Sequence, residues 1–402
     1  MERKILHVDV NSAFLSWTAV DMLKQGAKID IRTIPAIIGG DEEKRKGIVL
    51  AKSVLAKKYG IQTAEPIYFA KQKCPNLQIY QSNFKVYHYY SNALYELLHE
   101  YTDKIERFSI DECFLDITDF IPKGKTDLQI AYEIHERVKQ ELGFTVNIGV
   151  APNKVLAKMA SDFEKPDKVH TLYTSEIPNK MWKLPVSELL MVGKRSLPKL
   201  ELLGIKTIGE LAHTPKELLE NQFGKFGKMI WEYANGIDHS EVISMPEEPK
   251  SIGNSSTLPQ DMKDLEKIEE ILLALTEQTC YRLRKHQLLA HTVGVQIKNK
   301  DFKMYSHQKS LTTDTDSTKI IYETAKQILK EMFQGEPIRL IGIKVDKLTT
   351  KEKQQLSLFD TPKNEKQQKL DQTLDRLKEK YGYDAVTRAG KMKIDEMMDF
   401  KD

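Results

Sequence analysis

The stretch Ser109–Ile117, which reads SIDECFLDI, combines two adjacent carboxylates with an apolar run. Phe114 and Leu115 follow the acidic pair closely, so Asp111 and Glu112 are expected at the edge of a core. Neighbouring side chains of a regular strand point to opposite faces. A turn or bulge must therefore lie here if both carboxylates serve one site.

A second acidic position lies near the start of the chain. Residues 7–14 read HVDVNSAF, and Asp9 stands at the end of the apolar stretch Lys4–Val10, which predicts a buried strand. Phosphoryl transfer often uses two divalent ions about 4 Å apart, held by carboxylates, and Mg²⁺ prefers oxygen ligands. A single carboxylate is more often a helix cap or a solvated group. Only the combination with apolar flanks favours a metal site.

Strand and helix patterns alternate through the first 165 residues. A helix is expected over Asn11–Met22, directly after the first strand. Strands are predicted over 33–38, 47–50, 145–150 and, as a pair, 105–120; helices are predicted over 51–59, 87–101, 128–142 and 154–163. This alternation predicts an α+β or α/β sheet domain.

The pattern changes after Pro185, where short helices joined by glycine turns continue to Gly236 and predict a separate helical domain. Residues 245–257 are rich in Pro, Gly and Ser and predict a linker. From 258 to about 348 two amphipathic helices alternate with strands. A charged helix is predicted over 365–381.

Composition narrows the class of protein. The chain has 402 residues, which is long for one core, and a net charge of only +3, so a nucleic-acid surface would need segregated basic residues. Its three cysteines are far apart and form no C-x-x-C pair, which argues against a zinc knuckle or disulfide scaffold. The N-terminus lacks a signal-peptide pattern, and no apolar run approaches the ~18 residues of a membrane span. A cytoplasmic protein without a membrane partner is expected.

The joint pattern resembles the Y family of lesion-bypass DNA polymerases. HVDVNSAF and SIDECFLDI look like its two acidic motifs, and residues 151–167 (APNKVLAKMASDFEKPD) look like its triphosphate-binding segment. The resemblance implies an α+β multidomain fold of palm, fingers and thumb with a C-terminal α/β little finger. The implied boundaries are a palm at 1–10 and 78–167, fingers at 11–77, a helical thumb at 168–238, a linker at 239–257, a little finger at 258–350 and a tail at 351–402.

The same resemblance assigns roles to the acidic residues. Asp9, Asp111 and Glu112 would be catalytic and, with the backbone carbonyl of Val10, would hold two Mg²⁺ ions. The primer 3′-hydroxyl would attack the α-phosphate of a deoxynucleoside triphosphate and release pyrophosphate, with positioning and charge neutralisation supplying most of the catalysis. Template-directed synthesis of the translesion type is implied, with low fidelity and without a proofreading segment.

A nucleotide pocket is also implied. Phe14 falls where the family places an aromatic that crowds the sugar C2′ and excludes ribonucleotides; a core phenylalanine is the alternative. The backbone amides of Ser12, Ala13 and Phe14 open a predicted helix and could receive phosphate oxygens. Lys165 would be a point charge on the triphosphate.

The segment AKSVLAKKYG (51–60) departs from the family pattern. Val54 and Lys57 stand where the family commonly has a tyrosine and an arginine. Lys57 keeps the charge but loses the bidentate fork, and Val54 has no hydroxyl to donate. We expect reduced nucleotide affinity, or another donor such as Lys52 or Lys58.

Two regions are predicted to hold DNA. Residues 189–211 resemble the family's helix-hairpin-helix, in which Gly193 and Lys194 would contact phosphates. Met191 replaces an expected glycine and Pro198 is predicted to interrupt the second helix, so an ordinary helical hairpin is the alternative. Residues 280–310 hold seven Lys or Arg against one acid, a local excess that attracts a phosphate backbone. The candidate contacts there are Arg282, Arg284, Lys298, Lys300 and Lys303.

The tail contains QLSLF at 355–359, which resembles the peptide that binds the sliding clamp in bacterial polymerases. Leu356, Leu358 and Phe359 would enter an apolar groove while Gln355 hydrogen-bonds. The implied partners are primer–template DNA, deoxynucleoside triphosphates and the clamp, with the protein acting as a monomer.

Two other functions stay open from the sequence. A catalytically weak, clamp-tethered DNA-binding accessory factor would account for Val54, Lys57 and Met191. A palm-type nucleotidyl cyclase shares the paired carboxylates but would need neither a basic domain nor QLSLF.

Overall fold

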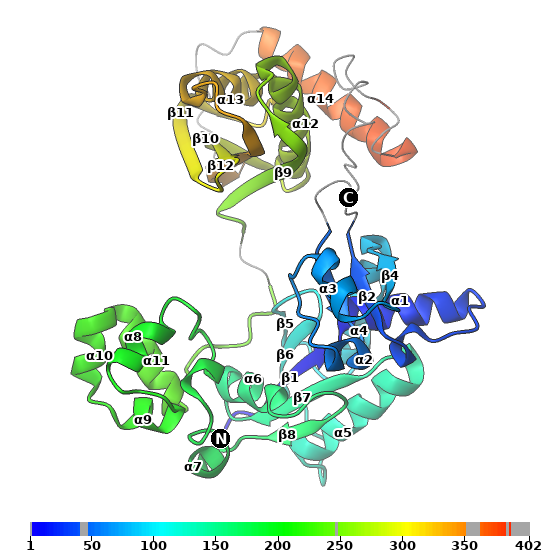
Figure 1. Ribbon diagram of the computed structural model, residues 1–402, viewed down its shortest axis with the longest axis vertical. Coiled ribbons are helices and arrows are strands. Elements are labelled where there is room, and N and C mark those ends of the chain that lie inside the picture. The colour runs from blue at the N-terminus through cyan, green and yellow to red at the C-terminus, as the bar shows by residue number, and fades with distance from the viewer. Residues whose placement is uncertain (1, 41–46, 246–247, 351–361, 383–385, 387–402) are drawn as a thin grey trace. The chain divides into compact units, whose positions relative to one another are not determined.

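The chain forms two compact units, one from residues 1–40 and 48–246 and the other mainly from residues 247–402 (Figure 1). The structure is a computed structural model, which describes residues 2–40, 47–245, 248–350, 362–382 and 386. QLSLF at 355–359 lies outside the described residues. No helix among the described residues is both long and apolar enough to span a bilayer.

A five-stranded sheet organises the first unit. Its strand order is β5-β6-β1-β7-β8. The bounds are Ile5–Val10 for β1, Ile105–Arg107 for β5, Glu112–Asp116 for β6, Val146–Ala151 for β7 and Val169–Thr171 for β8. The central strand β1 is fully buried and runs antiparallel to both β6 and β7. The predicted strands of this region are confirmed, while the short edge strand β8 was missed.

Helices cover both faces of this sheet (Figure 1). On one face, Leu6 and Val8 of β1 pack in a core with Trp17 and Tyr87; this core collects residues of α1 (Ala13–Lys24), α4 (Phe84–His99) and α5 (Asp127–Arg137). The opposite face is covered by α6 (Lys154–Asp162). A Cβ on Gly149 of β7 would lie 1.9 Å from the carbonyl oxygen of α6 residue Ala157, so only glycine permits this close packing.

A smaller sheet of order β3-β2-β4 lies in the region expected to form the fingers and extends past the expected boundary at residue 77, because β4 pairs with β2. Its strands are β2 (Ala36–Gly39), β3 (Val49–Lys52) and β4 (Gln78–Gln81), accompanied by α2 (Val54–Lys58) and α3 (Ile67–Lys73). They share a core of their own that includes Ile37, Val49 and Ile67. Sequence patterns missed α3 and β4, because α3 is only two turns long and β4 reads QIYQ with both glutamines exposed.

Short helices follow, as predicted. In the predicted region after Pro185 they are α8 (Leu197–Leu202), α9 (Ile208–His213), α10 (Lys216–Phe223) and α11 (Lys225–Ala234). One more short helix, α7 (Ile177–Lys180), precedes that region. The prediction that Pro198 interrupts a helix is wrong. Pro198 lies in the first turn of α8, where a proline needs no hydrogen-bond partner and its fixed φ suits the helix.

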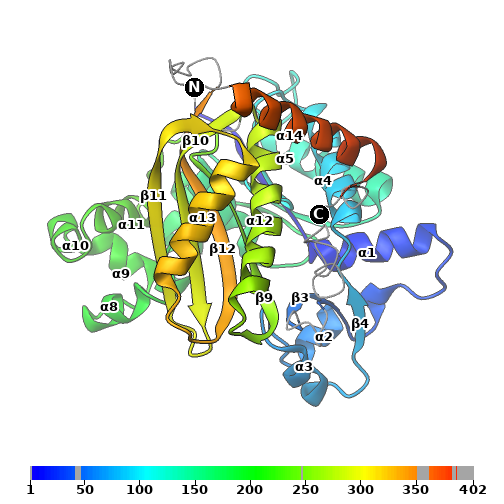
Figure 2. The ribbon, with the colours of Figure 1, turned by 90° about the horizontal axis from the view of Figure 1, so that it is seen from above.

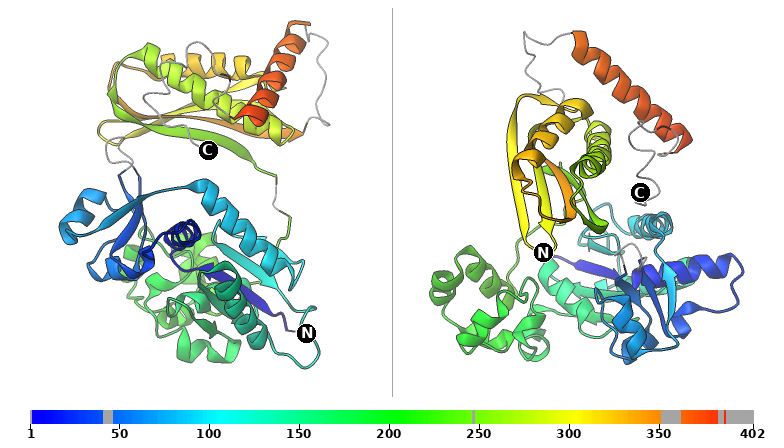
Figure 3. Two further views of the ribbon diagram at one scale, coloured as in Figure 1. Left: turned by 90° about the vertical axis from the view of Figure 1, so that its right-hand side faces the viewer. Right: turned by 45° about the horizontal axis from the view of Figure 1, so that its top comes forward.

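The second unit is a four-stranded antiparallel sheet of order β11-β10-β12-β9. Its strands are β9 (Ser251–Met262), β10 (Leu288–Asn299), β11 (Met304–Thr315) and β12 (Ile338–Thr350). Helices α12 (Leu265–Lys285) and α13 (Thr318–Met332) lie together on one face (Figures 2 and 3). A further helix, α14 (Pro362–Tyr381), belongs to this unit.

The predicted linker at 239–257 is too long at its C-terminal end. Residues from Ser251 onward belong to β9, which pairs with β12 in the register Asn254 to Ile343. The segment is rich in Ser and Gly but has a strand's alternation, because Ile252 and Leu258 enter the core while residues between them are small and polar. Sequence composition alone concealed this pattern.

Candidate active site

The three predicted carboxylates lie where β1 ends and β6 begins, at the same end of these two adjacent strands. Asp9 is the register partner of Glu112 across β1 and β6. The backbone N–H of Val10 donates to the carbonyl oxygen of Asp111 at 3.0 Å. The N–H groups of Phe108 and Ser109 both donate to the carbonyl of Glu112, at 3.0 and 3.2 Å. These bonds close the turn that the sequence required before Glu112.

Lysines from the chain segment after β7 neutralise the carboxylates. Lys158 of α6 lies 2.9 Å from a carboxylate oxygen of Glu112, and Lys165 is ion-paired with Asp9. Burial raises the pKa of Asp9, and the charge of Lys165 opposes that rise. Burial also acts to raise the pKa of Glu112, but the neighbouring His7 and Lys158 lower it to about 2.

The donor set suits a hard divalent cation, because three carboxylates and the Val10 carbonyl provide oxygen alone. Within the described residues, however, no three His, Cys, Asp or Glu side chains are arranged as a metal-binding cluster. Each carboxylate is instead engaged by a neighbouring side chain. Asp9 and Glu112 are held by lysines, and Asp111 accepts a 2.6 Å hydrogen bond from the hydroxyl of Ser109. An ion would exchange with these partners.

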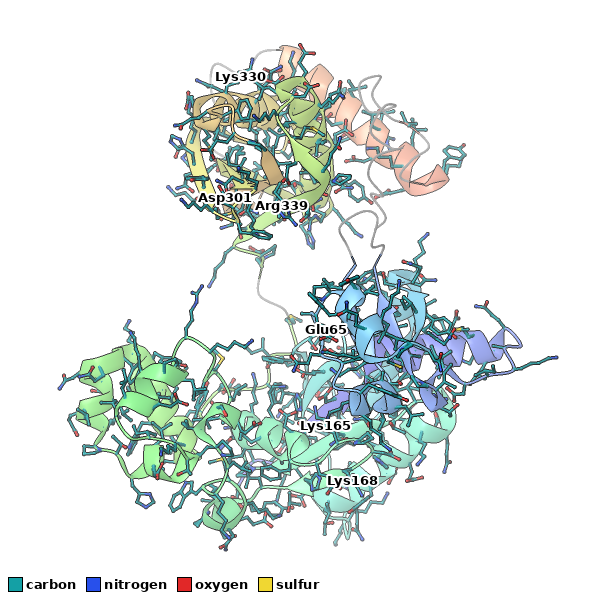
Figure 4. The ribbon with its side chains drawn as sticks, viewed as in Figure 1. Glu65, Lys165, Lys168, Asp301, Lys330 and Arg339 are labelled. Atoms are coloured by element: carbon teal, nitrogen blue, oxygen red, sulfur yellow. The ribbon has the colours of Figure 1, made fainter. Side chains whose placement is uncertain are left out.

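A cavity of about 370 Å³ adjoins Asp9 and Asp111. Every residue predicted for the nucleotide lines it, and Figure 4 shows Lys165 where the fingers elements meet the palm. Glu112 does not line the cavity. The lining residues are Asp9, Val10, Asn11, Ser12, Ala13, Phe14, Leu50, Ala51, Lys52, Ser53, Val54, Lys57, Thr63, Asp111, Lys165 and Pro166.

Phe14 is held in place by other aromatic rings. It stacks on Tyr87 of α4 with ring centroids 4.5 Å apart and an interplanar angle of 16°. Phe84 meets Phe14 edge-on at 5.9 Å. No side chain caps the start of α1, where Ser12 has the left-handed conformation φ 48°. The role of Tyr87 was missed, because nothing in the sequence links residue 87 to residue 14.

The two thumb residues that were predicted to contact DNA are exposed, but one of their backbone N–H groups is already hydrogen-bonded. Gly193 and Lys194 are exposed, but the N–H of Gly193 donates to the hydroxyl of Ser196 at 3.1 Å within the turn. Met191 has φ 73°, a left-handed backbone that glycine adopts more easily. The turn therefore keeps a glycine-like geometry with a bulkier residue.

In the second unit, Lys300 and Lys303 are exposed at the turn between β10 and β11, and Lys298 is half-buried beside them. Arg282 is exposed on α12 and donates to the carbonyl of Gly253 at 2.7 Å. All four remain predicted DNA contacts.

Arg284, which was predicted to contact DNA, makes its contacts inside the second unit instead. Its side chain is only 10% exposed, and its guanidinium makes a two-point contact with Asp375 of α14 at 2.5 and 3.0 Å. It also donates to the carbonyl of Asp316 at 2.9 Å. The sequence concealed this role because Asp375 lies 91 residues away.

Comparison with known proteins supports the same class. Residues 8–162 match a model of the impB/mucB/samB family, 249–358 match the C-terminal domain of that family, and 188–238 match a thumb-domain model of DNA polymerase iota. The chain is 48% identical to DNA polymerase IV of Clostridium acetobutylicum, over 97% of this chain and 98% of that one. It is 36% identical to DNA polymerase IV 1 of Bacillus subtilis, over 98% and 94%.

A solved Y-family polymerase chimera, Dbh-Dpo4(243-245)-Dbh, has the same fold. The TM-score is 0.74 at 24% identity, covering 86% of this chain and 99% of that one. Fold, cavity and relatives together define a DNA-directed DNA polymerase with palm, fingers, thumb and little finger. The chain belongs to the Y family, the translesion DNA polymerases. Polymerases of this family depend on divalent metal ions, and the prediction of an enzyme is confirmed.

Replacing Arg284 tests its structural role. Arg284→Gln would leave the half-buried carboxylate of Asp375 without its cation, which costs about 3 kcal/mol. Amides of α14 should then exchange hydrogen faster, while DNA affinity stays near the wild-type value.

The control is Arg282→Gln on the same helix. This variant should weaken DNA binding and reduce its salt dependence, with α14 exchange unchanged. A loss of DNA affinity in Arg284→Gln with normal α14 protection would restore the original prediction.

Proposed function

We propose that this polymerase extends a primer 3′ end by a two-metal mechanism with low fidelity and without proofreading. The observation that carries this proposal is that Asp9 and Asp111 line one cavity together with Lys57, Lys165 and Phe14. Phosphates and carboxylates repel one another. Anionic phosphates could therefore bind in this cavity only if cations were bound to the carboxylates.

The carboxylates would bind two Mg²⁺ ions through Asp9, Asp111, Glu112 and the carbonyl of Val10. When bound, the ions would supply charge neutralisation and lower the pKa of the attacking hydroxyl. The β1–β6 pairing keeps Asp9 opposite Glu112, and the Val10–Asp111 backbone bond fixes the turn beside them. These bonds hold together the backbone that carries the proposed ligands, while the carboxylate side chains would have to leave their present partners.

The cavity would hold the incoming deoxynucleotide. Lys165 and Lys57 would face its phosphates, with the N–H groups that open α1 at Ser12 and Ala13 as further donors. Phe14 would press against the sugar C2′. Because Phe14 is stacked on Tyr87, it could not move aside cheaply for a 2′-hydroxyl.

DNA would be held by the thumb and by the second unit. Lys194 and the Gly193 turn offer exposed contacts on the first unit. Arg282, Lys298 and the exposed Lys300 and Lys303 supply positive charge on the second. Their contribution would be electrostatic and independent of sequence, as lesion bypass requires.

The proposal includes a sliding clamp that binds Gln355, Leu356, Leu358 and Phe359 as an extended peptide. The protein would act as a monomer, since every residue proposed to hold a metal ion or a substrate belongs to one chain. A cytoplasmic setting is consistent with Cys74, Cys113 and Cys280, which are free and buried.

Asp111→Ala should reduce primer extension with Mg²⁺ at least about a hundredfold, because it removes a group that stabilises transition-state charge. Thermal unfolding should be unchanged, since Asp111 is only half-buried. The matched control is Asp119→Ala, which removes a surface carboxylate paired with Lys104. Extension by the variant at the wild-type rate would contradict the mechanism. Cyclic product from free triphosphate in the wild type would instead indicate a cyclase.

Phe14→Ala should raise ribonucleotide incorporation relative to deoxynucleotide incorporation by about tenfold or more, because the pocket then accepts the extra hydroxyl. Single-nucleotide insertion kinetics measure this ratio. Phe69→Ala, which removes an exposed fingers aromatic outside the cavity, should leave the ratio unchanged. An unchanged ratio in Phe14→Ala would remove the assignment of Phe14 as a sugar gate.

Deleting residues 355–359 should abolish stimulation by the clamp while sparing extension without it. Lys351→Ala with Lys353→Ala is the control in the same segment, and should keep stimulation. Equal stimulation of the deletion variant and the wild type would refute the clamp contact.

A further inference from the structure

Two lysines of β3 and α2 line the cavity and make no ion pair with another described residue. Lys52 ends β3 and Lys57 belongs to α2, and both line the cavity with Thr63. Within the described residues, neither lysine has a carboxylate at ion-pair distance. The charge of Glu65 favours the protonated form of Lys52, but the ion pair of Glu65 is with Lys73, at 2.5 Å.

We propose that Lys52 is a nucleotide-binding residue that, with Lys57, holds the terminal phosphates of the incoming triphosphate. In this chain the pair replaces the tyrosine hydroxyl and arginine fork that the family commonly provides. The inference rests on the proposed function and deepens it by naming a residue of its substrate site.

The position of Lys52 is set by the fold. Ser53, which follows it, is buried and accepts the N–H groups of Ala36 and Ala56 at 3.1 and 3.0 Å. The neighbouring backbone is therefore fixed on both sides. The ammonium of Lys52 donates to the hydroxyl of Thr63 at 3.0 Å. A lysine has three donors, so two stay available to phosphate oxygens.

Charge favours an anion at this point. Lys52 is half-buried, and its pKa is lowered by burial and, next in size, by the charge of Lys57. Lys165, which also lines the cavity, already has Asp9 and Asp162 as partners. Of the three lysines that line the cavity, Lys52 and Lys57 are therefore the two without an ion pair to a described residue. A polyanion would relieve the repulsion between their ammonium groups.

The departures at positions 54 and 57 fit this arrangement. Val54 is 51% exposed and lines the cavity without a polar atom. Lys57 is a point charge that cannot form a fork. A second point charge nearby compensates for both losses. Lys58, the other candidate from the sequence, is exposed and does not line the cavity, so it cannot play this part.

The test compares Lys52→Met, which keeps most of the apolar stem, with Lys52→Arg and with the control Lys58→Met. Equilibrium dialysis would measure dATP binding to the complex with dideoxy-terminated primer–template and Mg²⁺. Inhibition of primer extension by inorganic tripolyphosphate would measure phosphate binding without sugar or base. Thr63→Val breaks the Lys52 hydrogen bond while keeping its charge.

We expect dATP affinity and tripolyphosphate inhibition to weaken together by about tenfold or more in Lys52→Met, the size of one charge-assisted hydrogen bond. Lys52→Arg should recover most of the loss, Thr63→Val should lose less than Lys52→Met, and Lys58→Met should match the wild type. DNA affinity should be equal in all variants.

Wild-type tripolyphosphate inhibition in Lys52→Met would overturn the proposal, as would a loss that Thr63→Val reproduces together with a lower unfolding temperature, since both indicate a packing role. If the wild type extends no primer and binds no dATP, the proposed function fails with it. If the wild type does both and Lys52→Met binds equally well, this inference alone fails.

Discussion

The antiparallel pairing of β1 with β6 is the constraint on which the rest of this enzyme depends. It sets Asp9 opposite Glu112, and the turn that precedes β6 adds Asp111 beside them. Carboxylates at this spacing repel one another, so the surroundings must supply cations. Lys158 and Lys165 provide them in the protein alone. Metal ions would replace these partners, which links ligand exchange to substrate binding.

The same strand also connects the two layers that pack on opposite faces of the sheet. Alternate residues of β1 enter different layers: Leu6 and Val8 pack in the core shared with α1, α4 and α5, while His7 contacts Ser161 of α6 at 2.7 Å. Phe14, which lines the cavity, belongs to α1 on the first face. Lys158 belongs to α6 on the opposite face. The close approach at Gly149 holds α6 against the sheet, so substitutions there would disturb a lysine partner of Glu112.

Sequence patterns predicted the parts whose cause is local. The buried strand ending at Asp9, the turn before Glu112 and the cavity residues Phe14 and Lys165 were all recognisable from apolar spacing and motif resemblance. Long-range pairing was not recognisable. Nothing in the sequence near Arg284 indicates that its guanidinium will pair with Asp375. The stacking of Phe14 on Tyr87 depends on the packing of two helices. Composition also misled at β9, where small polar residues resemble a linker but pair as a strand.

The central claim is that Asp9, Asp111 and Glu112 converge on a pair of cations at the primer end. The most direct measurement is a crystal structure with dideoxy-terminated primer–template, an incoming nucleotide and Mn²⁺, using anomalous scattering to locate the metal. The account predicts two peaks about 4 Å apart, with Asp9 contacting both and Glu112 freed from Lys158. Manganese bound only to the triphosphate, with the Asp9 carboxylate remote from both peaks, would contradict it.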